Sequence, residues 1–240
     1  MKSSTCRLAP MVLVFSLVSS VAHGGYHGRD LDGDPSTIEA IYDSFLNITW
    51  LRDAGYAATS GYDPDGMMSW YEATTWAANL SFYNPVKNIT YDNWRLPATM
   101  QPDPSCSNQT SGVSGGFNCM GSELGHLFYF GLSGIAGHPI TQSGDPDFYA
   151  FTHLYNEPYW SGTEAPDSSR AWYFNTYSGF QATSLKTGGP GFAWAVTSGD
   201  VAAVPEAETW TMLLAGVGLV GWAARRKAGS KRPHVVFADA

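Results

Sequence analysis

The sequence predicts an α+β domain built on a twisted, mainly antiparallel sheet. Two helical patterns occur in the first half of the chain, and short strand patterns separated by turn residues fill the second half. A few helices followed by a run of strands are typical of α+β domains, whereas regular alternation would indicate a parallel sheet. Residues 23–204, which remain when the two terminal segments are set aside, are one domain's length of chain.

The two helices are predicted from their start signals and from apolar spacing. Ser69 and Glu72 form a capping box, in which each side chain bonds the backbone N–H of the other residue. Apolar residues then recur at helical spacing as far as Leu80. Ser122 and Glu123 open a second helix, which is predicted to run to about residue 132.

The strands are predicted from apolar and polar residues that alternate between turn signals. An early strand covers 47–50, and a Gly/Tyr/Asp-rich loop follows it over 53–66. Four later segments show the strand pattern: Tyr159–Thr163, Ala171–Asn175, Gly179–Leu185 and Phe192–Thr197. The short connection 176–178 between the second and third of these predicts a hairpin.

The N-terminus has the pattern of a secretory signal peptide. Lys2 and Arg7 precede an apolar run over 11–21, and Ser20-Val21-Ala22 supplies small residues at a cleavage site. We therefore predict a Sec-type signal peptide at 1–22. A short membrane anchor is the alternative, although this run is short for a hydrocarbon core of about 30 Å.

The C-terminus combines an acidic motif that contains proline, an apolar run and a basic end. Val204, Pro205 and Glu206 precede the run 210–224, in which no charged residue occurs. Three cations follow it directly and form the predicted membrane stop: Arg225, Arg226 and Lys227. Because such cations stay in the cytoplasm, the chain before the run is expected to lie outside the inner membrane.

This C-terminal pattern resembles the PEP-CTERM sorting signal of Gram-negative bacteria, although Ala207 stands where the family usually has a second proline. The resemblance implies a linker at 202–208, a membrane helix with its basic stop at 209–227, and a cytoplasmic tail at 228–240. It also implies a transient stay in the inner membrane and processing by an exosortase-type enzyme. The protein would then reach the cell surface or the extracellular matrix. A permanent single-span anchor is the alternative.

The exported part of the chain is strongly acidic. Residues 23–204 contain six Lys or Arg residues and 18 Asp or Glu residues, which give a formal charge of −12. A surface of this sign repels nucleic acid and anionic lipid headgroups, and no basic stripe is present in the sequence. Exopolysaccharide or another neutral glycan, a divalent cation or the matrix itself remain as partners, and nucleic acid is excluded.

Cys106 and Cys119 are predicted to form a disulfide. Cys6 leaves with the signal peptide, so two cysteines remain in an oxidising compartment. They enclose a Ser/Gly/Asn-rich segment, and closing a loop of that length stabilises the fold by about 3 kcal/mol. A copper-binding or redox-active pair is the alternative.

Two segments supply weak calcium ligands. Asp30, Asp32 and Asp34 lie in an acidic, turn-rich lead over 23–37, but glycine comes too early for an EF-hand loop. Gln101 and Asp103 flank Pro102 in the tripeptide that galactose-type C-type lectins use for calcium and sugar, without the Trp-Asn-Asp block that should follow. We predict no cofactor, with calcium as the alternative.

Residues 38–201 resemble the Lcl C-terminal-type domain, a bacterial family of unknown function. The blocks that carry the resemblance are Tyr42-Asp43 with 47–54, Asn93-Trp94-Arg95-Leu96-Pro97, 121–127, 159–164 and the end segments at 171–174, 179–181 and 193–196. The resemblance implies a C-type-lectin-like fold, related to formylglycine-generating enzymes, with paired terminal strands and a loop region that can host ligands. It supplies no established activity.

The blocks also predict particular contacts. Five tryptophans are expected to be buried, each with a partner for its indole N–H: Trp50, Trp94, Trp160, Trp172 and Trp194. Arg95 is expected to form a structural ion pair with a carboxylate such as Glu123, with ligand binding as the alternative. His126 is expected to be a surface or helix-capping residue.

We therefore expect a non-enzymatic, exported surface or matrix protein whose molecular activity is unknown. The first alternative is a calcium-assisted carbohydrate-binding module. The second is an oxidase like the formylglycine-generating enzymes, which would need a reactive Cys106–Cys119 pair.

Overall fold

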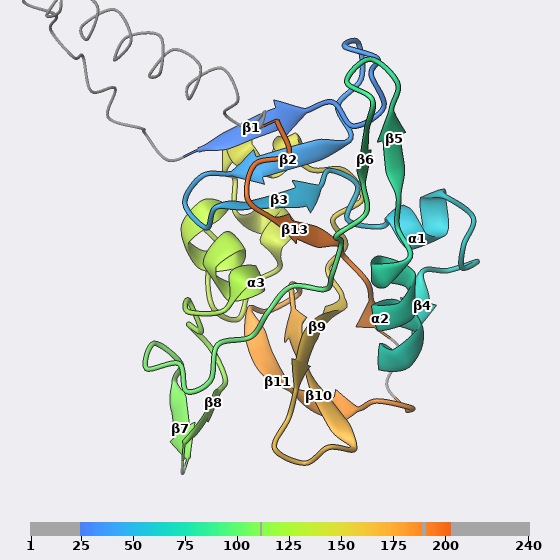
Figure 1. Ribbon diagram of the computed structural model, residues 1–240. Coiled ribbons are helices and arrows are strands. Elements are labelled where there is room, and N and C mark those ends of the chain that lie inside the picture. Colours follow the sequence, from blue (N-terminus) through green and yellow to red (C-terminus); the bar gives the residue numbers. More distant parts are fainter. Residues whose placement is uncertain (1–24, 111, 189–190, 203–240) are drawn as a thin grey trace, which may run out of the picture.

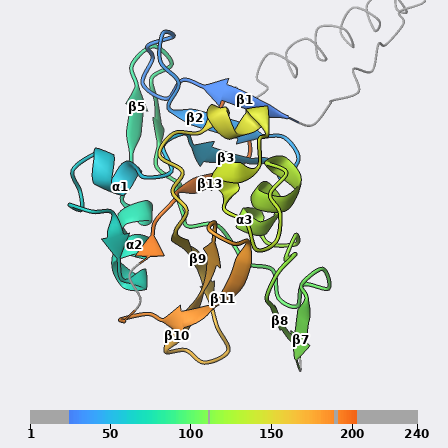
Figure 2. The same ribbon diagram turned by 180° about the vertical axis from the view of Figure 1, so that it is seen from behind.

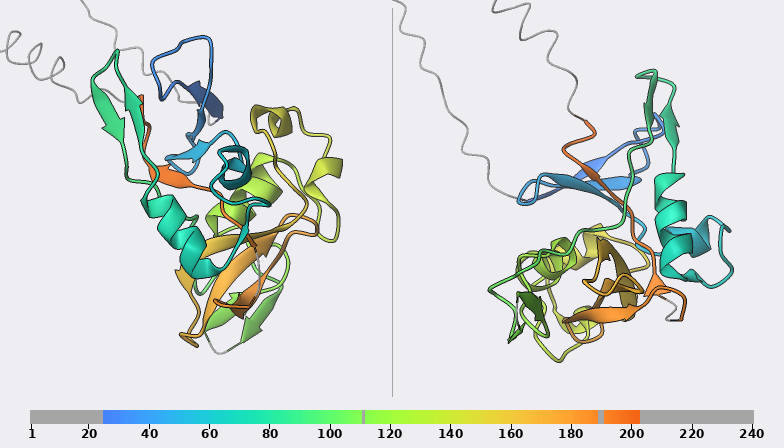
Figure 3. Two further views of the ribbon diagram at one scale, coloured as in Figure 1. Left: turned by 90° about the vertical axis from the view of Figure 1, so that its right-hand side faces the viewer. Right: turned by 60° about the horizontal axis from the view of Figure 1, so that its bottom comes forward.

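Two sheets, most of whose strand pairs are antiparallel, carry the fold (Figure 1). The computed structural model describes residues 25–110, 112–188 and 191–202. In Figure 3, right, the four-stranded sheet lies above the second sheet, with α2 (Trp70–Ala78) on one side and α3 (Glu123–His126) on the other. The predicted α+β class with antiparallel sheets is confirmed.

The first sheet joins the two ends of the described chain. Its order is β1-β2-β3-β13, and every neighbouring pair is antiparallel. The strands are β1 (Tyr26–Arg29), β2 (Ala40–Asp43), β3 (Ile48–Leu51) and β13 (Val196–Ser198). β1 lies in the segment that was expected to be an acidic lead outside the domain. All four of its residues pair with β2, so this segment is part of the sheet. The folded unit therefore begins before residue 38.

The second sheet contains five strands in the order β11-β10-β9-β12-β4. They are β4 (Met67–Met68), β9 (Pro158–Glu164), β10 (Arg170–Asn175), β11 (Phe180–Leu185) and β12 (Gly191–Phe192). The predicted β10–β11 hairpin is confirmed. β12 pairs with β9 in parallel, which departs from the antiparallel expectation.

The strand predicted over 192–197 is divided between the two sheets. Phe192 pairs in the second sheet, Val196 pairs in the first, and the three residues between them are buried as the chain passes from one sheet to the other. A continuous apolar segment is buried at every position, so its sequence does not mark the change of sheet.

Local signals define the helices well. The capping box at Ser69 and Glu72 is present, and it starts α2 as predicted. The second predicted helix begins as α3 and continues as a π-helical turn, Leu127–Gly131. A Cβ atom at Gly131 would overlap the Tyr26 hydroxyl, so a larger residue there would displace the Tyr26 side chain. Three further turns of helix lie in segments without a predicted helix: α1 (Tyr56–Thr59), Ile140–Gln142 and Pro146–Ala150.

Two small hairpins project from opposite ends of the molecule (Figures 1 and 2). The first consists of β5 (Phe82–Asn84) and β6 (Ile89–Tyr91), and the second of β7 (Asn108–Thr110) and β8 (Val113–Gly115). The second hairpin continues the second sheet, because the backbone groups of Gly116 and Gln181 exchange two hydrogen bonds of 2.8 Å.

The five expected tryptophans are buried, which confirms the prediction. The rings of Trp50 and Trp194 lie 4.7 Å apart between the sheets. The indole N–H of Trp160 donates to the Met68 carbonyl at 2.9 Å, and that of Trp194 donates to the Leu51 carbonyl at 2.7 Å. Trp172 differs, because its indole nitrogen has no hydrogen-bond partner among the described residues.

Among the described helices, none has the length and apolar character needed to span a bilayer. The predicted signal peptide at 1–22 and the predicted membrane helix at 209–227 lie outside the described residues.

Candidate functional site

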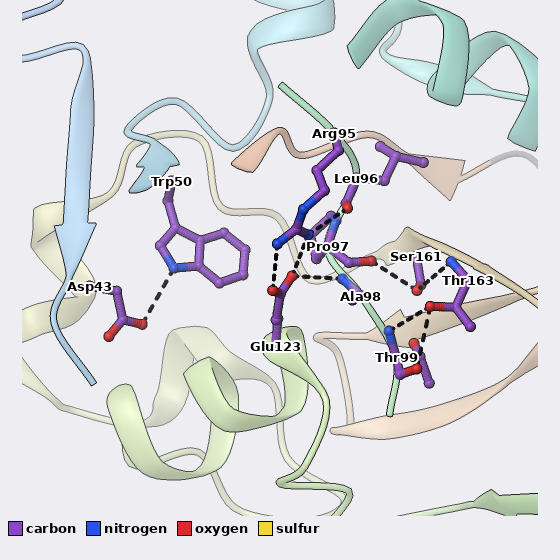
Figure 4. A network of polar contacts seen from close by, with 10 residues as sticks. All are labelled: Asp43, Trp50, Arg95, Leu96, Pro97, Ala98, Thr99, Glu123, Ser161 and Thr163. Carbon is purple, nitrogen blue, oxygen red and sulfur yellow. Dashed lines mark hydrogen bonds and ion pairs between the residues drawn. The ribbon is translucent and has the colours of Figure 1, made fainter. Parts of the chain in front are cut away.

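The sequence blocks meet at one ion pair, between Arg95 and Glu123 (Figure 4). The guanidinium is bidentate: Nη1 donates to Oε2 and Nη2 donates to Oε1, each at 2.7 Å. The backbone N–H of Ala98 also donates to Oε2, at 2.6 Å. The hydrogen bond with Glu123 raises the pKa of Arg95 above its usual range. The predicted partner of Arg95 is confirmed.

The same segment is tied to both sheets. The backbone groups of Arg95 exchange hydrogen bonds of 2.9 and 2.8 Å with Val196 of β13. The Ser161 hydroxyl on β9 donates to the Pro97 carbonyl at 2.9 Å, and the Thr163 hydroxyl accepts from the Thr99 N–H at 2.9 Å. The network therefore joins α3 to β9 and β13, and its role is structural.

Arg95 also borders a hollow of about 250 Å³ next to α2. The guanidinium is partly exposed there, but Glu123 already neutralises its charge. Thr74, Ala78 and Leu96 are among the residues that line the hollow, so its walls are largely apolar. This arrangement offers little attraction to an anionic ligand.

The Gln-Pro-Asp residues form a structural clamp. Both amide atoms of Gln101 bond the backbone of Ser114, each at 2.7 Å. One carboxylate oxygen of Asp103 accepts from the Ser105 N–H at 3.0 Å and the other accepts from the Gly121 N–H at 2.8 Å. Asp103 is buried. Its oxygens hold the loop in shape, and they do not face solvent as a lectin's calcium ligands would.

Two carboxylates of the acidic lead and that of Glu39, which follows it, lie close together. Oxygens of Asp30, Asp32 and Glu39 lie within 4.8 Å of one another. Asp34, which the sequence placed with them, instead accepts a 2.9 Å hydrogen bond from the backbone of Ser36. Asp30 and Glu39 already accept backbone N–H groups, from Gly33 at 2.6 Å and from Leu31 at 2.9 Å. These bonds give the cluster a role in shaping the turn.

The predicted disulfide between Cys106 and Cys119 is confirmed, and both residues are buried. In this bridged form the sulfur atoms are not free thiolates, which are the form that ligates copper. The pair contacts Gln181 on β11, whose amide nitrogen lies 3.9 Å from the sulfur of Cys106.

A buried carboxylate at Asp43 was not foreseen as a functional feature. Its Oδ1 accepts from the Phe45 N–H at 3.0 Å, and its Oδ2 lies 3.4 Å from the indole nitrogen of Trp50 (Figure 4). Burial raises the pKa of Asp43. His126 lies near it and packs on Phe130, with ring centroids 4.9 Å apart, and burial lowers the pKa of His126.

His126 was expected to be a surface or helix-capping residue, but its side chain is half-buried and makes no cap hydrogen bond. Its Nδ1 is buried without a hydrogen-bond partner among the described residues. Helix position alone predicted a surface histidine, and the contact with the β2–β3 turn comes from tertiary packing that the sequence does not display.

A larger hollow lies between α1 and the end of α2. It has a volume of about 410 Å³, and eight residues line it: Tyr56, Ser60, Gly61, Tyr62, Trp76, Asn79, Leu80 and Ser81. None of the eight carries a charge. Aromatic walls with a few neutral hydrogen-bonding groups are typical of small-molecule sites, and a hollow of this volume falls in their usual range of roughly 300–1,000 Å³. Sequence patterns did not predict this hollow, because α1 lies in the segment predicted to be a loop.

Residues 203–227 match the model of the PEP-CTERM protein-sorting motif. The chain carries this sorting motif. The match includes the predicted motif residues Val204, Pro205 and Glu206 and the basic end at 225–227, all outside the described residues. Comparison with curated proteins and with solved structures found no match. The motif implies export through a membrane-anchored intermediate that an exosortase-type enzyme processes.

Proposed function

We propose that the protein is a non-enzymatic surface or matrix module of C-type-lectin-like type, delivered by its PEP-CTERM signal. The match at 203–227 is the observation that supports export of the protein to the cell surface. The Lcl-type resemblance is supported by the first sheet, which contains the first and last described strands, β1 and β13, although β13 pairs with β3 and not with β1 or β2. The Arg95–Glu123 ion pair supports a structural role for the blocks that the resemblance rests on.

Delivery is tested by tagging both ends of the mature chain in a native Gram-negative host. We expect the C-terminal tag to separate from the domain when the processing enzyme is present and to remain attached when it is deleted. A control variant, Pro205→Ala with Glu206→Ala, should keep its C-terminal tag in either host. A wild-type tag that stays covalently attached at steady state would show a permanent anchor instead.

The disulfide between Cys106 and Cys119 supports the non-enzymatic part of the proposal. An oxidase of the formylglycine-generating type would need these two cysteines as a reactive pair. Oxygen uptake by the purified protein, loaded with copper and given a cysteine peptide, is the direct test. We expect the rate to equal that of the Cys106→Ser variant. Uptake that depends on Cys106 would establish the oxidase.

A second function, binding of neutral glycans, is favoured by the hollow between α1 and α2. Sugars present C–H faces that pack on aromatic rings and hydroxyls that bond neutral polar groups, and both kinds of group line this hollow. Exopolysaccharide is a partner of this chemistry. The cluster of Asp30, Asp32 and Glu39 is the candidate calcium site for this function.

A glycan screen followed by calorimetry, with calcium and with chelator, tests this second function. Tyr62→Ala should weaken binding by about tenfold or more, as removal of an anchoring aromatic does. Tyr83→Ala is the matched control, because Tyr62 and Tyr83 are 55% and 54% exposed and Tyr83 lies on β5, outside the hollow. Equal losses in the two variants would exclude the hollow as the site.

A further inference from the structure

Both ends of the described chain meet the turn between β2 and β3. The backbone N–H of Gly25 donates to the Ser44 hydroxyl at 2.8 Å, and that of Gly199 donates to the Asn47 carbonyl at 2.8 Å. Figure 1 shows the two ends of the coloured ribbon at the β1–β2 side of the molecule. The turn is therefore the part of the domain next to the point where the chain leaves toward its sorting signal.

Phe45 in the same turn forms an exposed aromatic pair with Phe130. Phe45 and Phe130 are 45% and 55% exposed, and their rings meet edge to face with centroids 5.0 Å apart. Phe130 belongs to the π-helical turn that follows α3, and its other side packs on His126. Two phenyl rings held in contact and left open to solvent are a small apolar surface, which we call the Phe45–Phe130 patch.

A short tether limits how far this patch can be from the membrane. The apolar run predicted to enter the bilayer starts at Trp210, after Thr209, and the matched motif begins at residue 203. From Ala202 to Thr209 the chain spans at most about 25 Å, at about 3.5 Å per residue. Arg29 holds Asp200 at 2.7 Å, so the tether starts from a fixed point on the first sheet.

We propose that, in the membrane-anchored intermediate, the domain rests on the outer surface of the inner membrane through the Phe45–Phe130 patch. The proposal builds on the anchored intermediate and is independent of any glycan binding. Phenyl rings on an otherwise polar surface insert at the boundary between headgroups and acyl chains. The contact holds the domain in one orientation while the motif at 203–206 waits outside the bilayer for its processing enzyme.

Binding through the patch does not require anionic lipid headgroups. The ring contacts of Phe45 and Phe130 are with one another and with His126, and the exported chain has a formal charge of −12. Electrostatic attraction to an anionic leaflet therefore cannot be the source of binding, and burial of the rings must be. Contact should persist in vesicles of phosphatidylcholine alone.

Photocrosslinking of the full chain tests the contact. The chain is reconstituted into vesicles of phosphatidylcholine, or of phosphatidylethanolamine with phosphatidylglycerol, with benzoylphenylalanine at position 45. The control places the same group at Tyr71, which is 51% exposed on α2. We expect at least about fivefold more lipid adduct at position 45 than at 71, because an inserted ring contacts acyl chains. Adding Phe130→Ser should return the yield to the control value.

Alkaline extraction of the same vesicles separates failure of the anchor from failure of the patch. Chain that resists extraction but gives equal lipid adducts at 45 and 71 would overturn the proposal. Protein–protein adducts at 45 in place of lipid adducts would show that a second copy covers the patch, which also overturns it. Adducts that form only with phosphatidylglycerol would show electrostatic binding and would overturn the ring-burial account.

Discussion

Removing Glu123 should destabilise the whole domain, because three hydrogen bonds end on its carboxylate. Two charged hydrogen bonds from Arg95 and one from the Ala98 N–H end on its oxygens. In Glu123→Ala the guanidinium keeps its charge and loses its partner, and the Ala98 N–H loses its acceptor. The variant therefore disconnects α3 from the segment that runs between β13 and β9.

The size of the effect follows from the burial of the pair. Removing one partner of a fully buried pair costs about 3–5 kcal/mol, whereas a surface pair contributes about 0–1 kcal/mol. The Arg95 side chain is 38% exposed and the Glu123 side chain 17%, so this pair lies between the limits. We expect a loss of about 2–3 kcal/mol in the free energy of unfolding. For a domain of this size that lowers the melting temperature by roughly 4–12 °C.

Urea and thermal unfolding of residues 23–203, followed by tryptophan fluorescence and circular dichroism, measures the loss. Asp92→Asn is the control, since it removes the same charge at an exposed site and should change stability by less than about 0.5 kcal/mol. The double variant Arg95→Leu with Glu123→Leu should cost less stability than the sum of the two single variants, because the double variant leaves no charge unpaired. A Glu123→Ala loss no larger than that of Asp92→Asn would refute the reasoning.

Three other predictions concern the core. Cys106→Ser should lower the free energy of unfolding by about 3 kcal/mol, the value expected for opening a loop of this length, and reductant should then have no further effect on denaturation. Trp160→Ala should cost about 3–5 kcal/mol in the same assay, since the side chain is buried and its N–H bonds Met68; a loss below 1 kcal/mol would contradict its core role. Burial raises the pKa of Asp43, so its stabilising contribution is complete below the ordinary carboxyl range near pH 4 and is lost as pH rises through the raised folded pKa. The free energy of unfolding of the wild type should therefore fall relative to that of Asp43→Asn between pH 4 and pH 7, and a constant difference across that range would exclude the raised pKa.

The elements that were predicted correctly are those with local causes. The capping box at Ser69 needs only two residues three positions apart, and the β10–β11 hairpin needs only a short turn between two alternating segments. β1 has no such signal. Its residues, Tyr26–Arg29, become a strand because β2 offers unpaired backbone groups beside them. The passage of 192–197 between the sheets is a non-local event of the same kind.

The site residues divide in the same way. The disulfide followed from counting cysteines in an oxidising compartment, and the partner of Arg95 followed from its place between two apolar residues. The burial of Asp43 against His126 and the hollow beside Tyr62 require elements that are far apart in sequence to come together. Periodicity and spacing describe one element at a time, so they cannot supply such contacts.

The location of the blocks decides where function should be sought. The residues that carry the family resemblance converge on Arg95 and Glu123, where nearly every polar group already has a partner within the fold. A substitution at Arg95 would reduce any activity of the protein simply by destabilising the fold. Tyr62 and Phe45 are exposed and contribute less to the core, so losses there at unchanged stability would report a ligand or a membrane directly. The surfaces outside the blocks are thus the informative targets, and binding lost only through Arg95 would indicate instability and not a site.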